Sequence, residues 1–140
     1  MYKASTNIEL FDLHDGPVHA ISIEGTAITL ELEFAIIGRD HPANPCPSAQ
    51  YIKPCTLQFQ GVSLHSTNVW VESTRSFAPH PCTSSPIEGD VIEFEPVASG
   101  EGYSVKLAGF HTAGWSEWQF SCTSVFVSWA EFGGEAWYES

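Results

Sequence analysis

Positive charge is scarce in this sequence. Five Lys and Arg residues stand against 17 Asp and Glu residues, which gives a formal net charge of −12 at pH 7. Nucleic acids and anionic membranes are bound by basic surfaces, so this balance argues against both as partners. It allows a basic protein or a cationic ligand, and it also serves solubility alone.

Long apolar runs are missing as well. The first residues, MYKASTNIELFDLHDG, contain no apolar core of a secretory signal, and no segment approaches the roughly 18 apolar residues of a membrane-spanning helix. We therefore expect a soluble, cytoplasmic protein with reduced thiols. The four cysteines form an even set, which leaves secretion with disulfides as the alternative, but four in 140 residues is not the density of a disulfide scaffold.

The motifs of common enzyme classes are also absent. The sequence has no Gly-rich phosphate loop, no dinucleotide fingerprint, no nucleophile elbow and no H-E-x-x-H zinc motif. Their absence weakens an enzymatic interpretation and favours a protein that works by binding.

What the sequence does contain is a two-residue alternation of apolar and polar side chains, which is typical of β-strands. In TAITLELEFAII the side expected to face the core comprises Ile28, Leu30, Leu32, Phe34 and Ile36. In the preceding VHAISIE it comprises His19, Ile21 and Ile23. A turn at Gly25 separates the two runs, so residues 17–37 are predicted to form a β-hairpin.

Two Pro-rich stretches, GRDHPANPCPSAQ and RSFAPHPCTSSPIEGD, are predicted loops, because proline interrupts helices and central strands. Further strands are expected in CTLQFQGVSL, bent at Gly61, and in TNVWVEST, VIEFEP, YSVKLAGF, SEWQFSC and SVFVSWAEF. No segment has a convincing helical stripe. The sequence therefore predicts one all-β domain over residues 1–140, a mainly antiparallel sandwich or strongly curved sheet of seven to nine strands.

The pair His14–Asp15 precedes the hairpin. His-Asp pairs bind metals or transfer protons in some enzymes, but such sites need further ligands, and here Pro17 and a strand follow directly. We expect Asp15 to cap the turn at Gly16 through backbone amides, and His14 to pack or hydrogen-bond beside the first strand. Adjacent side chains of an extended segment point in opposite directions, so the two are not expected to act together.

A zinc site is an alternative raised by the two Pro-rich loops. The segments HPANPC and HPC carry His41, Cys46, His80 and Cys82, and Cys and His are the ligands that zinc prefers. Cys55 is a further candidate, although it stands where a strand is expected to begin. Because the sequence has no C-x-x-C pair, we expect unpaired thiols and no cofactor, with zinc as the alternative.

The five tryptophans are candidate binding residues. Alternation with apolar neighbours predicts that most of them lie in the core and leaves Trp115 and Trp137 as the exposed ones. Exposed aromatic rings on an acidic β-sandwich stack sugars in carbohydrate-binding modules. They suit a protein interface equally well.

Acidic residues supply further candidates, namely Asp90, Glu93 and Glu95. Glu93 and Glu95 lie two residues apart on one strand face. A carboxylate pair so placed would suit a glycosidase, but residues at this spacing are also common solvent-facing neighbours. The expected use of these carboxylates is to attract a basic partner.

Three segments, LHDGPVHAISIEGTAITLELEF, CTLQFQGVSL and WQFSCTSVFVSW, resemble small bacterial all-β proteins in this order. Those proteins open with an HD-x-x-[ILV] segment, continue with a hairpin and an F-x-G-V strand, and end in a strand rich in aromatics. The matching signature residues here are His14, Asp15, Phe59, Gly61 and Val62. Some of these families are assigned as immunity proteins of polymorphic toxin systems, so the resemblance implies non-enzymatic neutralisation of a toxin.

The sequence thus predicts a non-enzymatic binding protein. The leading hypothesis is an immunity protein that covers a basic toxin with its acidic surface. The alternatives are binding of a carbohydrate or small ligand by exposed tryptophans, and binding of zinc by the Cys/His loops. The candidate binding residues are Trp115, Trp137, Glu93, Glu95 and Asp90.

Overall fold

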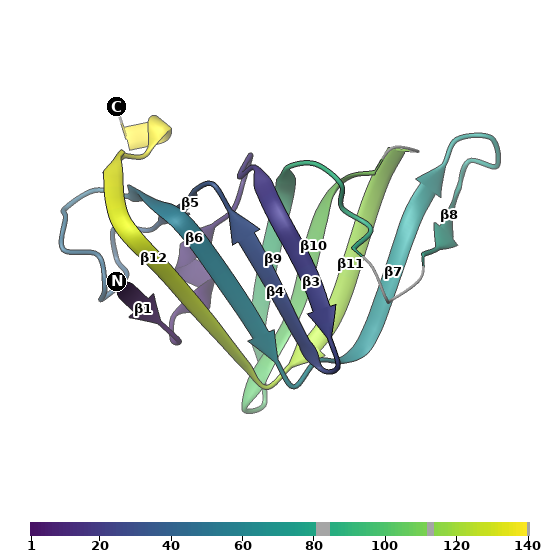
Figure 1. Cartoon of the computed structure of the whole chain (residues 1–140), viewed down its shortest axis with the longest axis horizontal. Helices are drawn as coiled ribbons and strands as arrows, with labels where there is room; N and C mark the ends of the chain where they lie inside the picture. Colours follow the sequence, from purple (N-terminus) through teal and green to yellow (C-terminus); the bar gives the residue numbers. More distant parts are fainter. Residues whose placement is uncertain (81–84, 112–113, 140) are drawn as a thin grey trace.

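The computed structural model describes residues 1–80, 85–111 and 114–139 and is built of two antiparallel β-sheets (Figure 1). Sheet A contains β1 (Tyr2–Ala4), β2 (Phe11–Asp12), β3 (Val18–Glu24), β4 (Ala27–Leu32), β5 (Ala35–Ile37), β6 (Gln50–Gln60) and β12 (Ser124–Glu135). Sheet B contains β7 (Ser63–Val71), β8 (Ser76–Pro79), β9 (Val91–Ser99), β10 (Gly102–His111) and β11 (Gly114–Cys122). Two 3₁₀ turns, η1 (Ile8–Leu10) and η2 (Trp137–Glu139), complete the described elements.

The strand order is β1-β12-β6-β4-β3 in sheet A, with β5 between β6 and β2, and β8-β7-β11-β10-β9 in sheet B. The predicted all-β, mainly antiparallel class is confirmed. Among the described residues the strands number twelve rather than seven to nine. The additional ones, β1, β2, β5 and β8, are two to four residues long, which is too short for an alternation to become visible.

The two sheets are joined at two neighbouring corners. The chain passes from β6 to β7 through Gly61 and from β11 to β12 through Thr123, and the Thr123 amide donates a hydrogen bond to the Gln60 carbonyl oxygen at 2.8 Å. Gly61 has a φ of +66°, and a Cβ at this position would lie 2.3 Å from Thr123 Oγ1. The predicted bend at Gly61 is therefore present, but it divides the predicted strand CTLQFQGVSL between the two sheets. The second half of that strand is continuous with TNVWV in β7.

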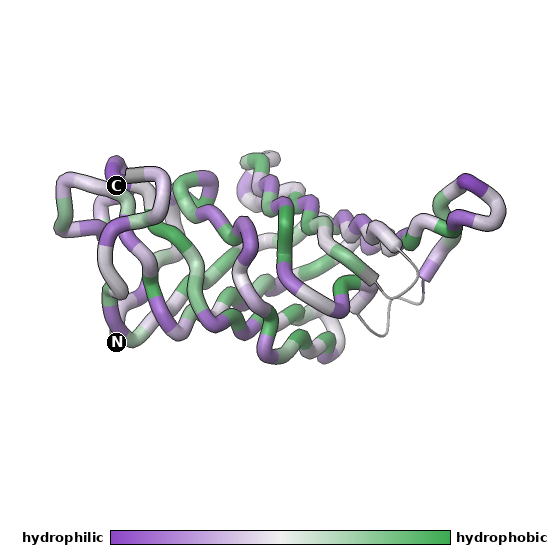
Figure 2. The backbone as a smooth tube through the Cα atoms, turned by 90° about the horizontal axis from the view of Figure 1, so that it is seen from above, coloured by the Kyte–Doolittle hydropathy of each residue, from purple (hydrophilic) through white to green (hydrophobic). Residues whose placement is uncertain are grey.

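The core lies between the inner faces of the two sheets. Trp118 of β11 and Trp129 of β12 are its largest fully buried side chains. In β4 and β6 the predicted alternation is confirmed, because Ile28, Leu30, Leu32, Leu57 and Phe59 are all buried there. Viewed from above, the β7–β8 hairpin projects beyond the body of the molecule (Figure 2).

Beyond Leu32 the predicted phase of the hairpin is wrong. The chain bends at Glu33, and Ala35 and Ile37 then enter the main core while Ile36 joins a separate small cluster. The segment after the bend is β5, which pairs with β6 and β2 and does not prolong β4.

His19 is also not on the core face where the alternation placed it. A register shift between Val18 and Ala20 leaves His19 exposed, whereas Ile21 and Ile23 pack against the core as predicted. The hairpin itself, β3 with β4, is confirmed.

The Pro-rich stretches are shorter loops than expected. β6 begins at Gln50 and includes Pro54, which has no register partner in the described neighbouring strands. On one side of β6 the neighbouring strand changes at Pro54, because β4 pairs as far as Cys55 (with Leu32) and β5 pairs from Ile52 (with Ala35). The missing N–H of proline therefore breaks no hydrogen bond of the ladder on that side. The second stretch contains β8. Within the described ranges, no helix is long and apolar enough to span a membrane.

Candidate functional site

Three of the five predicted binding residues lie on one surface, the outer face of sheet B. Trp115 is on β11, and Glu93 and Glu95 are on β9. Asp90 is exposed in the residue before β9. Trp137 belongs to η2 beyond β12, at the opposite end of the molecule from β8 (Figure 1). The structure therefore separates Trp137 from Trp115.

Trp115 belongs to a row of four aromatic side chains that crosses four neighbouring strands. Phe110 of β10 is the register partner of Trp115, and Phe77 of β8 is the partner of Trp70 on β7. Since Ser116 pairs with Val69, the next position of the same antiparallel ladder sets Trp115 opposite Trp70. Val69 and Ser116 are buried on the inner face, so their neighbours Trp70 and Trp115 point outward. We call Phe110, Trp115, Trp70 and Phe77 the aromatic row.

The rings of the aromatic row contact each other in perpendicular pairs. The centroids of Phe110 and Trp115 are 5.3 Å apart with an interplanar angle of 86°, and those of Trp70 and Phe77 are 5.3 Å apart at 74°. Phe110 is 57% exposed and Phe77 43%, whereas the two indoles are half-buried. Three inter-strand spacings give the row a length of about 14 Å.

Polar side chains flank the aromatic row on the same face. Glu117 is two residues from Trp115 along β11, and Asn68 of β7 is its register partner. Lys106 of β10 lies 3.1 Å from Glu117 and 3.7 Å from Glu93, measured from Nζ to the nearer carboxylate oxygen. The pKa of Lys106 is raised, chiefly by the hydrogen bond that its ammonium group donates to Glu117. Slight burial opposes this shift, and the negative charges of Glu117, Glu93 and Glu95 add to it.

Glu95 is the register partner of Lys106, so three carboxylates surround one ammonium group. The cluster beside the aromatic row therefore keeps a net negative charge, because Lys106 offsets only one of its three carboxylates. An exposed aromatic strip beside carboxylates, an amide and an ammonium group combines ring stacking with hydrogen bonding in both directions.

Trp70 could be recognised from the sequence, because it stands out of phase between Val69 and Val71. Phe77 lies in a segment predicted as a loop, and Phe110 becomes part of the row only through its pairing with Trp115 across the β10–β11 hairpin.

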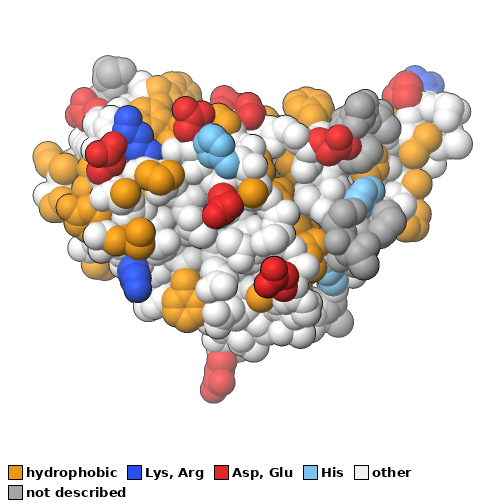
Figure 3. Space-filling model, viewed as in Figure 1, with side chains coloured by type: hydrophobic (Ala, Val, Ile, Leu, Met, Phe, Trp, Pro, Cys, Tyr) orange, Lys and Arg blue, Asp and Glu red, His pale blue; other side chains and the backbone are white. Residues whose placement is uncertain are grey.

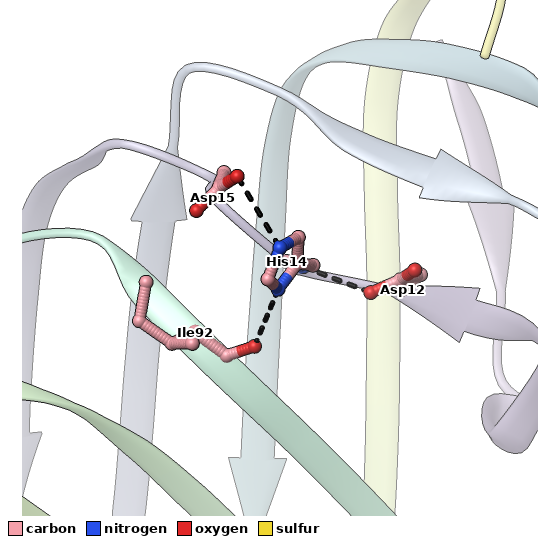
Figure 4. A network of polar contacts seen from close by, with 4 residues as sticks. All are labelled: Asp12, His14, Asp15 and Ile92. Atoms are coloured by element: carbon pink, nitrogen blue, oxygen red, sulfur yellow. Dashed lines mark hydrogen bonds and ion pairs between the residues drawn. The ribbon is translucent and has the colours of Figure 1, made fainter. Parts of the chain in front are cut away.

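The His14–Asp15 pair lies between the two sheets (Figure 4). His14 Nδ1–H donates to the carbonyl oxygen of Ile92 at 3.0 Å, and Nε2 faces Asp15 Oδ2 at 3.3 Å. Ile92 is the unpaired residue of a bulge in β9, and Val91 beside it donates its amide to the Gly16 carbonyl oxygen at 3.2 Å. The pair thus helps to tie the chain before β3 to the edge of sheet B, as the predicted hydrogen-bonding role of His14 requires.

Two details of this turn differ from the prediction. The cap is Asp12, whose Oδ1 accepts the amide of His14 at 2.8 Å, while Gly16 N–H bonds to the Leu13 carbonyl oxygen. Asp15 has a φ of +59°, which turns its side chain toward the imidazole, so the two neighbours do interact. The pKa of His14 is raised, chiefly by its hydrogen bond to the Ile92 carbonyl oxygen. The charges of Asp15 and Asp12 also raise this pKa, and slight desolvation lowers it.

The other signature residues have structural positions. Phe59 is buried in the core, Gly61 forms the corner between the sheets, and Val62 packs against the core beside it.

The candidate zinc ligands that the structure describes are not brought together. His41 is buried at the end of sheet A, where Nδ1 accepts the Ala43 amide and Nε2 donates to the Thr6 carbonyl oxygen. His80 follows β8 at the other end of the molecule (Figure 1). Cys55 is in the core, where burial raises the pKa of its thiol to about 12. Cys46 is half-buried, and Cys82 lies outside the described residues. Within the described ranges, no three His, Cys, Asp or Glu residues are grouped as metal ligands would be.

By fold, the chain is an all-β protein of two packed antiparallel sheets with an aromatic outer face. Comparison with protein-family models, with curated proteins and with solved structures finds no match to it.

Proposed function

We propose that the protein is a non-enzymatic binding protein that holds a carbohydrate chain along the aromatic row. The observation that supports this function most strongly is the alignment of four aromatic side chains across β10, β11, β7 and β8. A sugar ring presents C–H groups on its faces and hydroxyls at its rim. The rings of the row would stack on the former, and Glu117, Asn68 and Lys106 would bond to the latter.

The length of the row indicates a chain rather than a single sugar. About 14 Å exceeds the size of one hexose, and the two perpendicular ring pairs provide two separate places where a ring can stack. The excess of carboxylates around Lys106 disfavours an anionic ligand and suits a neutral glycan.

A glycan array followed by calorimetric titration of the best binder tests this function. Trp115→Ala and Trp70→Ala should each weaken binding by about tenfold or more, or ~1.4 kcal/mol. Trp137→Ala is the matched control, since it removes a tryptophan that is 63% exposed but remote from the row. A silent array, or equal effects of all three substitutions, would refute the proposal.

The second candidate function is binding of a basic protein, as in an immunity protein that neutralises a toxin. It is supported by the formal charge of −12 and by the resemblance of the His14–Asp15 segment to immunity-protein families. On the face seen in Figure 3 the acidic side chains are scattered rather than gathered, which argues against an extended acidic interface there.

Salt dependence separates the two functions. Affinity for a basic partner falls as ionic strength rises, whereas affinity for an uncharged glycan changes little. If a pull-down from the native host yields no protein partner, and affinity for any captured protein is unaffected by salt, the second candidate fails.

A further inference from the structure

A groove of about 820 Å³ lies on the outer face of sheet A, away from the aromatic row. This volume is in the range of small-ligand sites, roughly 300–1,000 Å³. The floor of the groove is formed by outward-facing residues of β4, β6 and β12, namely Thr29, Thr56, Gln58, Phe126 and Ser128. The face shown in Figure 3 is mostly uncharged over these strands, with a few separate acidic side chains near its centre.

The floor is organised in two cross-strand rows. One runs Thr29–Gln58–Phe126, and the other runs Thr56–Ser128–Lys3, with Lys3 on β1 at the edge of the sheet. Lys3 and Phe126 are diagonal neighbours, whose Cβ atoms lie about 7 Å apart in such a ladder. A ligand of the size of one sugar can therefore meet both side chains.

The β1 side of the groove is held in place by His41. Its ring joins the Thr6 carbonyl oxygen (3.1 Å) to the Ala43 amide (3.0 Å), so the chain after β1 and the loop before β6 are fixed to each other. Both segments line the groove. The groove is thus bounded by two segments that are bonded to each other, rather than by independent loops.

The polar groups of the floor are available to a ligand. Within the part of the chain that the structure describes, the hydroxyls of Thr29, Thr56 and Ser128 make no hydrogen bond, and Gln58 uses only its oxygen, which accepts from Gln60 at 3.1 Å. Phe126 is 43% exposed although it lies among polar side chains. An exposed ring beside free hydroxyl and amide groups suits a sugar.

Charge selects the kind of sugar. Among the described residues that line the groove, Lys3 is the one charged side chain of the Lys, Arg, Asp and Glu types. It forms no ion pair within the described part of the chain, although the sequence has 17 acidic and only five basic residues. The nearest acidic group along the same row is Glu31, the partner of Thr56 on β4, about 14 Å from Lys3 by three strand spacings. The β1 end of the groove therefore favours an anionic group.

We propose that this groove binds an acidic saccharide, a single sugar that carries one carboxylate. Its ring stacks on Phe126, its hydroxyls bond to Thr29, Thr56 and Gln58, and its carboxylate meets the ammonium group of Lys3. The proposal does not depend on the aromatic row, because the two surfaces belong to different sheets.

NMR titration of the labelled protein with glucuronate and with glucose tests the proposal, since the two probes differ only in the carboxylate. Glucuronate should shift the amides of β4, β6 and β12 and bind at least about fivefold more tightly than glucose. Lys3→Gln should abolish that preference. Lys53→Gln, which changes the net charge equally outside the groove, should preserve it. Phe126→Ala should weaken both sugars.

Equal affinity for glucuronate and glucose would overturn the proposal. So would the absence of shifts with glucuronate, galacturonate and N-acetylneuraminate at tens of millimolar. Trp115→Ala leaves the groove unchanged, so persistence of glucuronate binding in this variant separates the groove from the aromatic row. Loss of glucuronate binding there would also count against an independent groove.

Discussion

Replacement of Gly61 by alanine tests how the two sheets are joined. At φ +66° a residue with a Cβ costs about 1–2 kcal/mol, and the new Cβ would stand 2.3 Å from Thr123 Oγ1 and 2.8 Å from its Cγ2. Overpacking of this kind adds about 1–3 kcal/mol. We expect Gly61→Ala to lower the free energy of unfolding by about 3 kcal/mol, or the melting temperature by roughly 10 °C for a chain of this length.

Gly25 in the β3–β4 turn supplies the control. Its φ is +60°, almost the same as that of Gly61, but a Cβ there would meet no atom within 4 Å. Gly25→Ala should therefore cost only the backbone term, about 1–2 kcal/mol. The difference between the two variants isolates the contact with Thr123.

A double-mutant cycle completes the test. Thr123→Ala removes Oγ1 and Cγ2 and should recover about 1 kcal/mol or more of the Gly61→Ala loss, measured by urea denaturation. Equal costs for Gly61→Ala and Gly25→Ala, or no recovery on adding Thr123→Ala, would refute the described packing of the two corners.

Three further predictions concern stability. His14→Ala and Asp15→Ala should lower the melting temperature while ligand binding is retained in the folded protein; loss of binding at unchanged stability would give the pair a functional role. Trp118→Phe should lower the free energy of unfolding, measured by urea denaturation, by about 1 kcal/mol more than Trp129→Phe does. The reason is that the Trp118 indole N–H donates to His65, whereas that of Trp129 is buried without a partner among the described residues; equal costs would contradict this. Burial lowers the pKa of His65, so folding favours its neutral form, and its contribution to the free energy of unfolding is lost as pH falls below the unfolded value of 6.5. The pKa of His14 is raised, so its contribution to the free energy of unfolding is lost as pH rises through its folded pKa. Denaturation curves from about pH 5 to 8 should show the acid loss disappear in His65→Gln and the alkaline loss disappear in His14→Gln, and unchanged curves would refute it.

The long strands were predictable because each presents one face to the core. In β11 and β12, Trp118, Phe120, Val125 and Val127 alternate with exposed or half-buried residues, and burial of one face fixes that pattern in the sequence. The same logic failed after Leu32. Phe34 is apolar and continues the alternation, so nothing in the sequence marks the bend at Glu33 that reverses the phase.

The candidate site was only partly predictable for a different reason. Trp115 could be singled out from its own segment of the chain. Phe110 joins it across the β10–β11 hairpin and Phe77 joins Trp70 across the β7–β8 hairpin, but the two pairs meet only through the pairing of β11 with β7, which are far apart in the sequence. A single sequence does not encode such registers in any local pattern. Phe126 illustrates the complementary case, since it is an aromatic residue on the polar face between Val125 and Val127.

The measurement that tests the central claim most directly is the indole N–H NMR spectrum of the five tryptophans during titration with a glycan that binds. If the aromatic row is the binding surface, the indole signals of Trp70 and Trp115 shift together and saturate at the same ligand concentration. The signals of Trp118 and Trp129 in the core and of Trp137 in η2 remain in place. A shift confined to Trp137, or binding that leaves Trp70 and Trp115 unchanged, would contradict the account.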